Sequence, residues 1–420
     1  MNLRFILRAS LASFGTYFCM YAFRKPFAVA SYSDLDFWGV DYKIWLIIAQ
    51  ILGYTLSKFA GIKIISEMPS HRRLWYLVGF IGFAEAALLG FAVIPAPYNI
   101  FCLFLNGLPL GMIWGIVFSY LEGRRASELL GVILSSSFII SSGIVKSVGK
   151  WTMDHLGVSE FWMPVTTGAL FILPLVGCAW LLEKLPAPDA EDTYQKTLRL
   201  PMTAKERSSL FERFAGPLIL IVCFYTLLTA VRDFRDNFAR ELWDSLGYQE
   251  ATIYSISEIP IALVVLAIFG YIGTVVKNYQ AFMYYHFVLL VGCAAIVVST
   301  YLFQLGWLSP VVWMIISGLG LYAAYVPFNG IFFDRMIATF KIKGNVGFLI
   351  YIADAFGYLG SIAILFYKNF GRAELTWLRF FVEALYVLGF TGLGITVYCM
   401  YSFKRKKKKI ENIKQLIYEQ

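Results

Sequence analysis

The residues of this chain that could do chemistry are charged side chains inside apolar segments. Arg24 and Lys25 lie in the otherwise apolar run YFCMYAFRKPFAVA, directly before Pro26. A cation at mid-membrane costs about 2.5–3.5 kcal/mol on insertion scales, so such residues usually serve a function. Tyr17, Tyr21 and Arg24 follow i, i+4, i+7 spacing, which places two phenols and a guanidinium on one helical face. Pro26 is expected to kink this helix and to free backbone groups that are tolerated only toward protein or a watery cavity.

Two further segments repeat this combination of aromatic and charged residues. Tyr54 and Lys58 are four residues apart in GYTLSKFAG and therefore share a helical face. The segment FYTLLTAVRDFRDNF carries four charges, which are Arg232, Asp233, Arg235 and Asp236. Arg232 has a depth in its span comparable to that of Arg24, as expected of residues related by an internal repeat. Two guanidinium groups facing one cavity would suit a dianion, because arginine presents a planar fork to phosphate or carboxylate oxygens.

Simpler interpretations of these charges stay open. Arg24 is nearer the external end of its span, so its side chain could instead extend to the membrane interface. In the other segment, Asp233 and Asp236 could merely neutralise Arg232 and Arg235 near the external end of the helix.

The elements that carry these residues are predicted to be membrane spans. Of 420 residues, 59% are hydrophobic and 15% are charged, whereas soluble domains have about 45–50% apolar and about 25% charged residues. Runs of about 20 apolar residues, long enough to cross about 30 Å of hydrocarbon as helices, recur along the whole chain. We predict spans at residues 6–32, 43–65, 74–94, 98–121, 128–151, 160–182, 214–238, 250–274, 281–304, 309–334, 346–368 and 376–403.

The longest polar interruption divides these spans into two equal sets. We predict an N-terminal half at 1–182, a cytoplasmic linker at 183–213, a C-terminal half at 214–403 and a basic tail at 404–420. Lys and Arg residues fall mainly at alternate span ends, so the positive-inside rule predicts that both termini are cytoplasmic. The run KRKKKK directly after the last span is interpreted as a topology anchor and not as a nucleic-acid site.

Several functional classes are excluded by missing motifs. The sequence has no Walker motif, nucleophile elbow or zinc signature, which argues against an ATP-driven pump and most hydrolases. Its cysteines and histidines show no metal-ligand spacing. We therefore predict a protein that is not an enzyme and that needs no metal or cofactor.

Several strings, in order along the chain, resemble the organophosphate:phosphate antiporters of the major facilitator superfamily, which include glycerol-3-phosphate and hexose-phosphate transporters. In the first two spans the matching residues are Tyr17, Tyr21, Arg24, Lys25, Phe27, Tyr54, Ser57, Lys58 and Phe59. In later spans they are Tyr225, Arg232, Glu258, Gly347, Phe348, Phe356, Gly357, Tyr358 and Gly360. The resemblance implies the major facilitator fold, an all-α membrane protein with twelve transmembrane helices in two pseudo-symmetric six-helix halves. It also implies a bacterial-type cytoplasmic (inner) membrane.

The chain departs from this family at positions that bear on coupling. The family's phosphate transporters have a His in the fifth helix, where Ile140 stands here, and Asp354 adds an acid inside the eleventh span. A membrane-embedded carboxylate such as Asp354, Glu258 or Glu85 could bind a proton, which would favour proton symport over phosphate exchange. Alternatively, these acids pair with Arg24, Lys58 or Arg232 and hold the empty site closed.

The leading hypothesis is a monomeric secondary transporter that binds a small anionic, phosphorylated organic solute between its halves. Its predicted substrate-binding residues are Arg24, Arg232, Lys58, Tyr17, Tyr21, Tyr54 and Tyr358. Its predicted coupling or gating residues are Glu258, Asp354, Asp233, Asp236, Arg235 and Lys25. Inorganic phosphate or a proton would be the coupling ion. Two alternatives stay open, a proton-coupled symporter of a non-phosphorylated organic anion and a membrane sensor that binds an organophosphate without transporting it.

Overall fold

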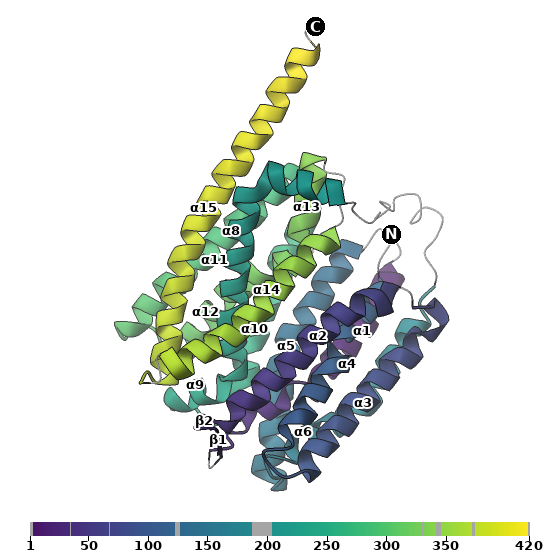
Figure 1. The fold of residues 1–420 in the computed structure, drawn as a ribbon, viewed down its shortest axis with the longest axis vertical. Coiled ribbons are helices and arrows are strands. Elements are labelled where there is room, and N and C mark those ends of the chain that lie inside the picture. Colours follow the sequence, from purple (N-terminus) through teal and green to yellow (C-terminus); the bar gives the residue numbers. More distant parts are fainter. Residues whose placement is uncertain are drawn as a thin grey trace. The chain divides into compact units, whose positions relative to one another are not determined.

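The fold is almost entirely helical (Figure 1). The computed structural model describes residues 3–33, 35–66, 68–121, 127–186, 204–329, 331–341, 346–371 and 374–418. Its helices are α1 (Leu3–Met20), α2 (Tyr42–Ser66), α3 (Arg73–Val93), α4 (Ile100–Ser119), α5 (Ser127–Leu156), α6 (Met163–Glu183), α8 (Ala204–Asn237), α9 (Ala239–Ser245), α10 (Ile253–Gly273), α11 (Asn278–Gln304), α12 (Pro310–Tyr325), α13 (Ile331–Phe340), α14 (Val346–Phe366) and α15 (Trp377–Tyr418). A two-residue antiparallel pair, β1 (Asp36–Phe37) and β2 (Val40–Asp41), precedes α2.

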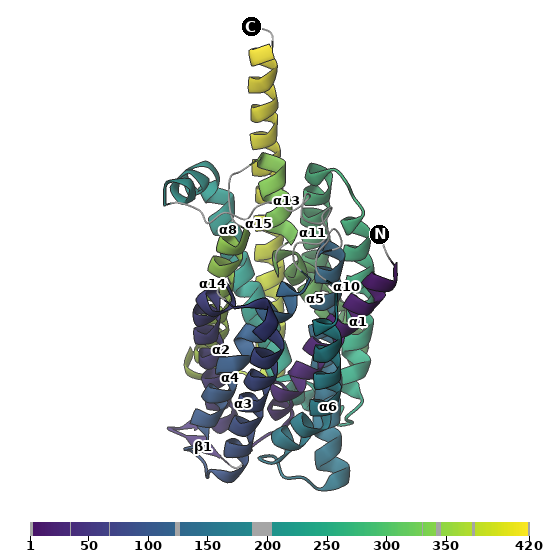
Figure 2. The same ribbon diagram turned by 90° about the vertical axis from the view of Figure 1, so that its right-hand side faces the viewer.

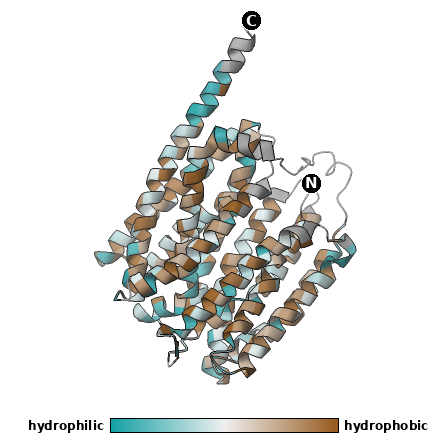
Figure 3. Ribbon diagram, viewed as in Figure 1, coloured by the Kyte–Doolittle hydropathy of each residue, from teal (hydrophilic) through white to brown (hydrophobic). Residues whose placement is uncertain are grey.

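The helices have the length and composition of membrane spans. Within the described residues, 10 helices are long and apolar enough to cross a bilayer. Figure 3 shows apolar residues along most of the helices, whereas the C-terminal part of α15 is hydrophilic. A helix satisfies its backbone hydrogen bonds within the segment, which is what a bilayer requires. The all-α membrane fold predicted from the sequence is thus confirmed.

Two predicted spans are broken where proline interrupts the helix. The span predicted at 6–32 is α1 followed by two short 3-10 helices, η1 (Tyr21–Phe23) and η2 (Pro26–Val29). The span predicted at 309–334 is α12, then the 3-10 helix η4 (Val326–Asn329), which contains Pro327, and then α13. Proline has no backbone N–H and its ring clashes with the carbonyl four residues earlier, so the helix cannot continue regularly.

Other helices are longer than predicted. α8 begins at Ala204, inside the predicted linker, and α15 continues to Tyr418 through most of the predicted basic tail. The tail contains no glycine or proline and consists largely of good helix formers. An ion pair between Lys407 and Glu411, with Nζ and Oε1 3.3 Å apart, adds support of the i, i+4 type.

The chain forms two compact units, which are described separately. Unit 1 comprises Met1–Lys196, Asp233–Leu266 and Leu365–Leu378, and unit 2 comprises Thr197–Arg232, Ala267–Ile364 and Arg379–Gln420. Unit 1 therefore combines the predicted N-terminal half with two segments of the predicted C-terminal half. The helices α8 and α10 each contribute residues to both units. The division into pseudo-symmetric halves at 183–213 stays a prediction.

In unit 1, α2 packs closely on α4, and α3 packs on the other side of α4 (Figure 2). A glycine permits the close approach, because a Cβ at Gly107 of α4 would lie only 2.4 Å from the Gln50 carbonyl oxygen of α2. α1 packs against α5 and α6. In unit 2, α11 packs against α12 and α13.

Candidate functional site

The break after α1 places Arg24 against tyrosines of unit 1. The backbone N–H groups of Arg24 and Lys25 both donate to the Tyr21 carbonyl, over 3.0 and 2.9 Å. The Arg24 guanidinium carbon lies 3.9 Å from the centre of the Tyr54 ring and 5.9 Å from that of Tyr21. The Tyr17 and Tyr21 rings contact each other edge to face, and all three tyrosines are buried. The phenol and guanidinium face predicted from spacing is therefore present, and Arg24 packs inside unit 1.

A second cation lies on the same tyrosine. The Lys58 ammonium is 5.6 Å from the centre of the Tyr54 ring and 5.8 Å from that of Trp114 on α4. Contacts of a cation with an aromatic face contribute about 0.5–2 kcal/mol each, more where water is excluded. Arg24, Lys58, Tyr54 and Trp114 together form a positively charged aromatic cluster. Trp114 was not among the predicted residues.

Unit 2 contains a comparable arginine site on different helices. The Arg232 guanidinium carbon lies 3.7 Å from the centre of the Tyr325 ring. Tyr225 stacks on Tyr325 with ring centres 5.4 Å apart, and its hydroxyl donates to the Asp354 carboxylate over 2.7 Å. Arg232, Tyr225, Tyr325 and Asp354 thus form one group in unit 2, where Tyr325 was missed by sequence reasoning.

Tyr358 is buried on α14. Its neighbour Gly357 allows the close packing of α14 on α8, because a Cβ there would lie 3.1 Å from both Tyr225 and Thr229. The role of Tyr358 in binding stays a prediction.

Two predicted gating charges, Lys25 and Asp236, lie in buried ion pairs of unit 1 together with Lys146, which was not predicted. The Asp236 carboxylate is paired with the ammonium groups of Lys25 and Lys146 and accepts a hydrogen bond from the Ser142 hydroxyl. Lys25 also donates to the Asn237 side-chain oxygen over 2.9 Å. Lys25, Lys146 and Asp236 have 4%, 3% and 9% of their surface exposed. We call these three residues the charge triad.

Arg235 and Glu258 form another buried pair in unit 1. Their Nη1 and Oε1 atoms are 2.6 Å apart, and both side chains are at most one-tenth exposed. Glu258 packs on α5, where a Cβ at Gly143 would lie 2.8 Å from its own Cβ. Asp233 is buried as well. Among the described residues Glu258 therefore pairs with Arg235, which differs from the alternative that it pairs with Arg24, Lys58 or Arg232. The predicted gating residue Asp236 pairs with Lys25 and Lys146.

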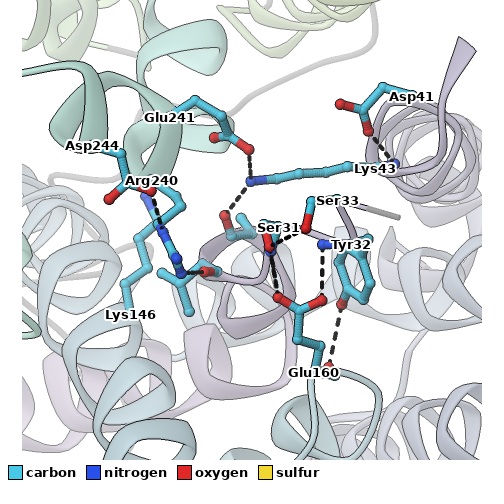
Figure 4. A network of polar contacts seen from close by, with 12 residues as sticks. Ser31, Tyr32, Ser33, Asp41, Lys43, Lys146, Glu160, Arg240, Glu241 and Asp244 are labelled. Carbon is cyan, nitrogen blue, oxygen red and sulfur yellow. Dashed lines mark hydrogen bonds and ion pairs between the residues drawn. The ribbon is translucent and has the colours of Figure 1, made fainter. Parts of the chain in front are cut away.

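A third set of contacts connects η2 and the first turn of α2 to α9 (Figure 4). Lys43 donates to Glu241 over 2.5 Å and to the Ala28 carbonyl over 2.7 Å. Arg240 donates to the Val29 carbonyl over 2.8 Å and pairs with Asp244. These contacts join the segment that follows the α1 break to residues of the predicted C-terminal half, all inside unit 1.

Burial raises the pKa of the Glu241 carboxyl, and the Lys43 ammonium offsets part of that rise. Folded Glu241 therefore holds a proton over a pH interval above about 4.3 in which the unfolded chain has lost it. Stability is expected to fall as the pH rises through this interval, and Glu241→Gln should remove that slope. Thermal unfolding between pH 4 and 8 checks this, with exposed Glu383→Gln as the control. Equal slopes in wild type and Glu241→Gln would contradict the assignment.

Sequence reasoning missed several of these residues although a signal was present for some. Lys146 is a cation inside the span predicted at 128–151, so the criterion that selected Arg24 would have selected it. Lys43 begins the span predicted at 43–65. Tyr325 and Trp114 gave no such signal, because aromatic residues are frequent in every span. Among the described residues there is also no group of three or more His, Cys, Asp or Glu placed to hold a metal ion.

Residues 26–406 match a family described as "Family of unknown function (DUF5690)". The chain belongs to this family. No curated protein matches the DUF5690 chain by sequence. The match includes the whole span that carries Arg232 but begins two residues after Arg24, and membership assigns no activity by itself.

Solved structures with similar folds are transporters. The DUF5690 chain superposes on the nucleoside transporter NupG with a TM-score of 0.60 at 16% identity, covering 96% of this chain and 100% of that one. A D-xylose-proton symporter gives 0.61 at 14% identity, with 95% and 97% covered. A bacterial homolog of the human lysosomal transporter Spinster, inward-facing and unoccupied, gives 0.60 at 12% identity, with 96% and 98% covered.

At such identities the likeness shows the fold alone, and that fold is the major facilitator fold of a multi-pass membrane protein, as predicted. All three of these proteins are transporters or symporters. None of the three is an organophosphate:phosphate antiporter by name, so this narrower resemblance stays a prediction.

Proposed function

We propose that this protein is a secondary transporter that moves a small anionic, phosphorylated organic solute across the membrane by alternating access. The observation that carries the proposal is a pair of arginines, one in each compact unit, each stacked on a tyrosine. Arg24 lies 3.9 Å from Tyr54 and Arg232 lies 3.7 Å from Tyr325. The fold, which transporters of several solutes share, supports the same proposal.

Stacking prepares an arginine to bind an anion. A tyrosine ring under the guanidinium holds the plane of the group, whose N–H fork then lies in that plane and can donate to two oxygens of one phosphate or carboxylate. Lys58 adds positive charge beside Tyr54. In our proposal Arg24 and Arg232 each bind anionic oxygens of the solute, and Tyr17, Tyr21 and Tyr358 line its path.

The buried ion pairs are proposed to gate the transport cycle. The charge triad and the Arg235–Glu258 pair supply contacts within unit 1, and the triad joins the predicted first and seventh spans. Alternating access requires the predicted halves to part on one side and then on the other. Solute binding would favour the state in which these pairs are broken. The free energy of that shift is at most the difference between the solute's binding free energies in the two states.

A second candidate is proton-coupled transport of a non-phosphorylated organic anion. The hydrogen bond from Tyr225 to Asp354 favours it, because it puts a carboxylate within the arginine site of unit 2. In that case Asp354 would bind the proton. A membrane sensor that binds the solute without flux is a third reading, for which the structure offers no separate support.

The experiment is uptake into proteoliposomes. Wild-type protein is expected to take up radiolabelled glycerol 3-phosphate or a hexose phosphate saturably, and faster when the lumen is loaded with inorganic phosphate. Acceleration by an inward proton gradient instead, together with uptake of carboxylates, would favour the second candidate. Solute binding in a thermal-shift screen without any flux would identify a sensor. If no anion were bound and no anion were transported, the proposal would be contradicted.

A further inference from the structure

We propose that Gln50 and Asn106 are positioning residues for Arg24. They hold the broken backbone between α1 and η2 so that the Arg24 guanidinium lies on the Tyr54 ring. This inference rests on the proposed function, since it assigns Gln50 and Asn106 a role in binding the same anion.

The break after α1 leaves backbone carbonyls without their usual helical partners. In a continuous helix the Arg24 carbonyl would accept from the Ala28 N–H, but that N–H donates to the Lys25 carbonyl over 3.1 Å. Pro26 lacks an N–H altogether. A buried carbonyl without a donor is costly, so the segment needs donors from other elements.

Two buried amides supply those donors. The Gln50 side chain of α2 donates to the Arg24 carbonyl over 3.0 Å. The Asn106 side chain of α4 donates to the Phe23 carbonyl over 3.0 Å and to the Ala84 carbonyl of α3 over 3.1 Å. Only 4% of Gln50 and none of Asn106 is exposed. The broken segment is thus anchored to α2 and α4, and Asn106 in turn connects α4 to α3.

The two amides also bind each other. Gln50 Nε2 donates to Asn106 Oδ1 over 2.8 Å, so the Asn106 oxygen has a donor while its nitrogen serves the two carbonyls. A carboxamide carries both a donor and an acceptor, whereas a leucine of similar size carries neither. Asparagine in place of Gln50 would be too short to reach the break.

The spacing on α2 connects these hydrogen bonds to the anion site. Gln50 and Tyr54 are four residues apart and therefore share one face of the helix. Gln50 binds the main chain of Arg24, while Tyr54 carries its guanidinium. Gly107, the residue after Asn106, packs closely on the backbone of Gln50 and Tyr54, and this contact fixes the position of α4 along α2. One helix therefore holds Arg24 by its backbone and by its side chain.

The test is the kinetics of organophosphate uptake into proteoliposomes. Gln50→Leu and Asn106→Leu are each expected to raise KM by about tenfold, the effect of one lost hydrogen bond, with a nearly unchanged maximal rate. The matched control is Asn99→Leu. Asn99 is an equally buried amide of unit 1 that donates to the Phe91 carbonyl, away from Arg24. It should lower the unfolding temperature and leave KM unchanged.

A second variant pair separates positioning from general packing. In an Arg24→Lys background, which lacks the planar fork, Gln50→Leu should raise KM by less than about threefold, because the two residues act through one contact. Unchanged KM in Gln50→Leu and Asn106→Leu, in a protein whose uptake depends on Arg24, would overturn the inference alone. An equal rise in Asn99→Leu would do the same. Absence of uptake by wild type would instead overturn the proposed function, and the inference with it.

Discussion

Proteoliposomes that contain Arg24→Ala or Arg232→Ala are expected to take up organophosphate at no more than the background rate. Each substitution removes a guanidinium that stacks on a tyrosine, at 3.9 Å for Arg24 and 3.7 Å for Arg232. Losing one partner of a desolvated, charge-assisted contact costs about 2–5 kcal/mol. At 1.4 kcal/mol per factor of ten, this corresponds to a loss of roughly 30-fold to more than 1,000-fold in transport efficiency.

Two controls distinguish loss of the anion site from loss of the fold. Arg24→Lys and Arg232→Lys keep the charge but not the planar fork, so they should retain uptake at an intermediate level. Arg379→Gln removes an arginine on the exposed face of α15, where it pairs with Glu383, and should transport like wild type. Uptake at the wild-type rate by correctly folded Arg24→Ala or Arg232→Ala protein would show that the arginines do not bind the solute.

Asp236→Asn is expected to have the largest effect on stability. Asp236 is the carboxylate that both Lys25 and Lys146 contact in the charge triad. Removing its charge leaves two ammonium groups that are less than one-twentieth exposed beside a neutral amide. Breaking a buried pair by removing one partner costs about 3–5 kcal/mol, because the remaining charge stays desolvated. Thermal unfolding in detergent should therefore shift strongly to lower temperature.

The charge triad can also be removed as a whole, without leaving a buried charge. Asp236→Leu combined with Lys25→Met and Lys146→Met replaces all three charges with apolar side chains and should recover most of the stability, as such replacements often do. The matched control is Asp154→Asn, which breaks the more exposed i, i+4 pair with Lys150 and should cost about 0–1 kcal/mol. A shift for Asp236→Asn no larger than that of Asp154→Asn would refute the role of the triad.

The triad also separates stability from transport. If it gates the cycle, the triple apolar variant should be folded and yet transport slowly, since no charge remains to favour closing the contact between these segments. If it is only structural, that variant should transport like wild type. Both a gating role and a structural role are considered because of Lys25. It follows Arg24 directly in the chain, but it contacts Asp236 and Asn237, whereas Arg24 lies on Tyr54.

Much of this site follows from composition and spacing. An apolar composition with recurring runs of about 20 residues leaves a membrane bundle as the available fold, because a bilayer admits only segments that satisfy their own backbone. Helical spacing placed Tyr17, Tyr21 and Arg24 on one face, and the structure has them together. Pro26 predicted the interruption of the first span, although α4, α6, α8 and α10 each continue through a proline, so proline alone does not decide where a helix ends.

Other features depend on contacts between distant segments, for which local sequence carries no signal. Lys25 meets Asp236 and Asn237 more than 200 residues later in the chain, and no periodicity within either segment indicates that partner. Arg232 lies on Tyr325 of α12, which is one of 26 tyrosines in the sequence. From the sequence alone, Asn106 could have lined a cavity or formed a hydrogen bond to any neighbouring helix.

By itself, the sequence determined that the chain is a helical membrane protein, and it singled out several of the charges that lie inside it, including Arg24, Lys25 and Asp236. These properties depend on local hydrophobicity, spacing and proline. Only the tertiary structure decided which partner compensates each charge, and that Gln50 and Asn106 bind the carbonyls exposed by the break after α1. The reason is that hydrogen bonds and ion pairs between helices depend on how the helices pack, which many weak contacts along the whole chain determine together.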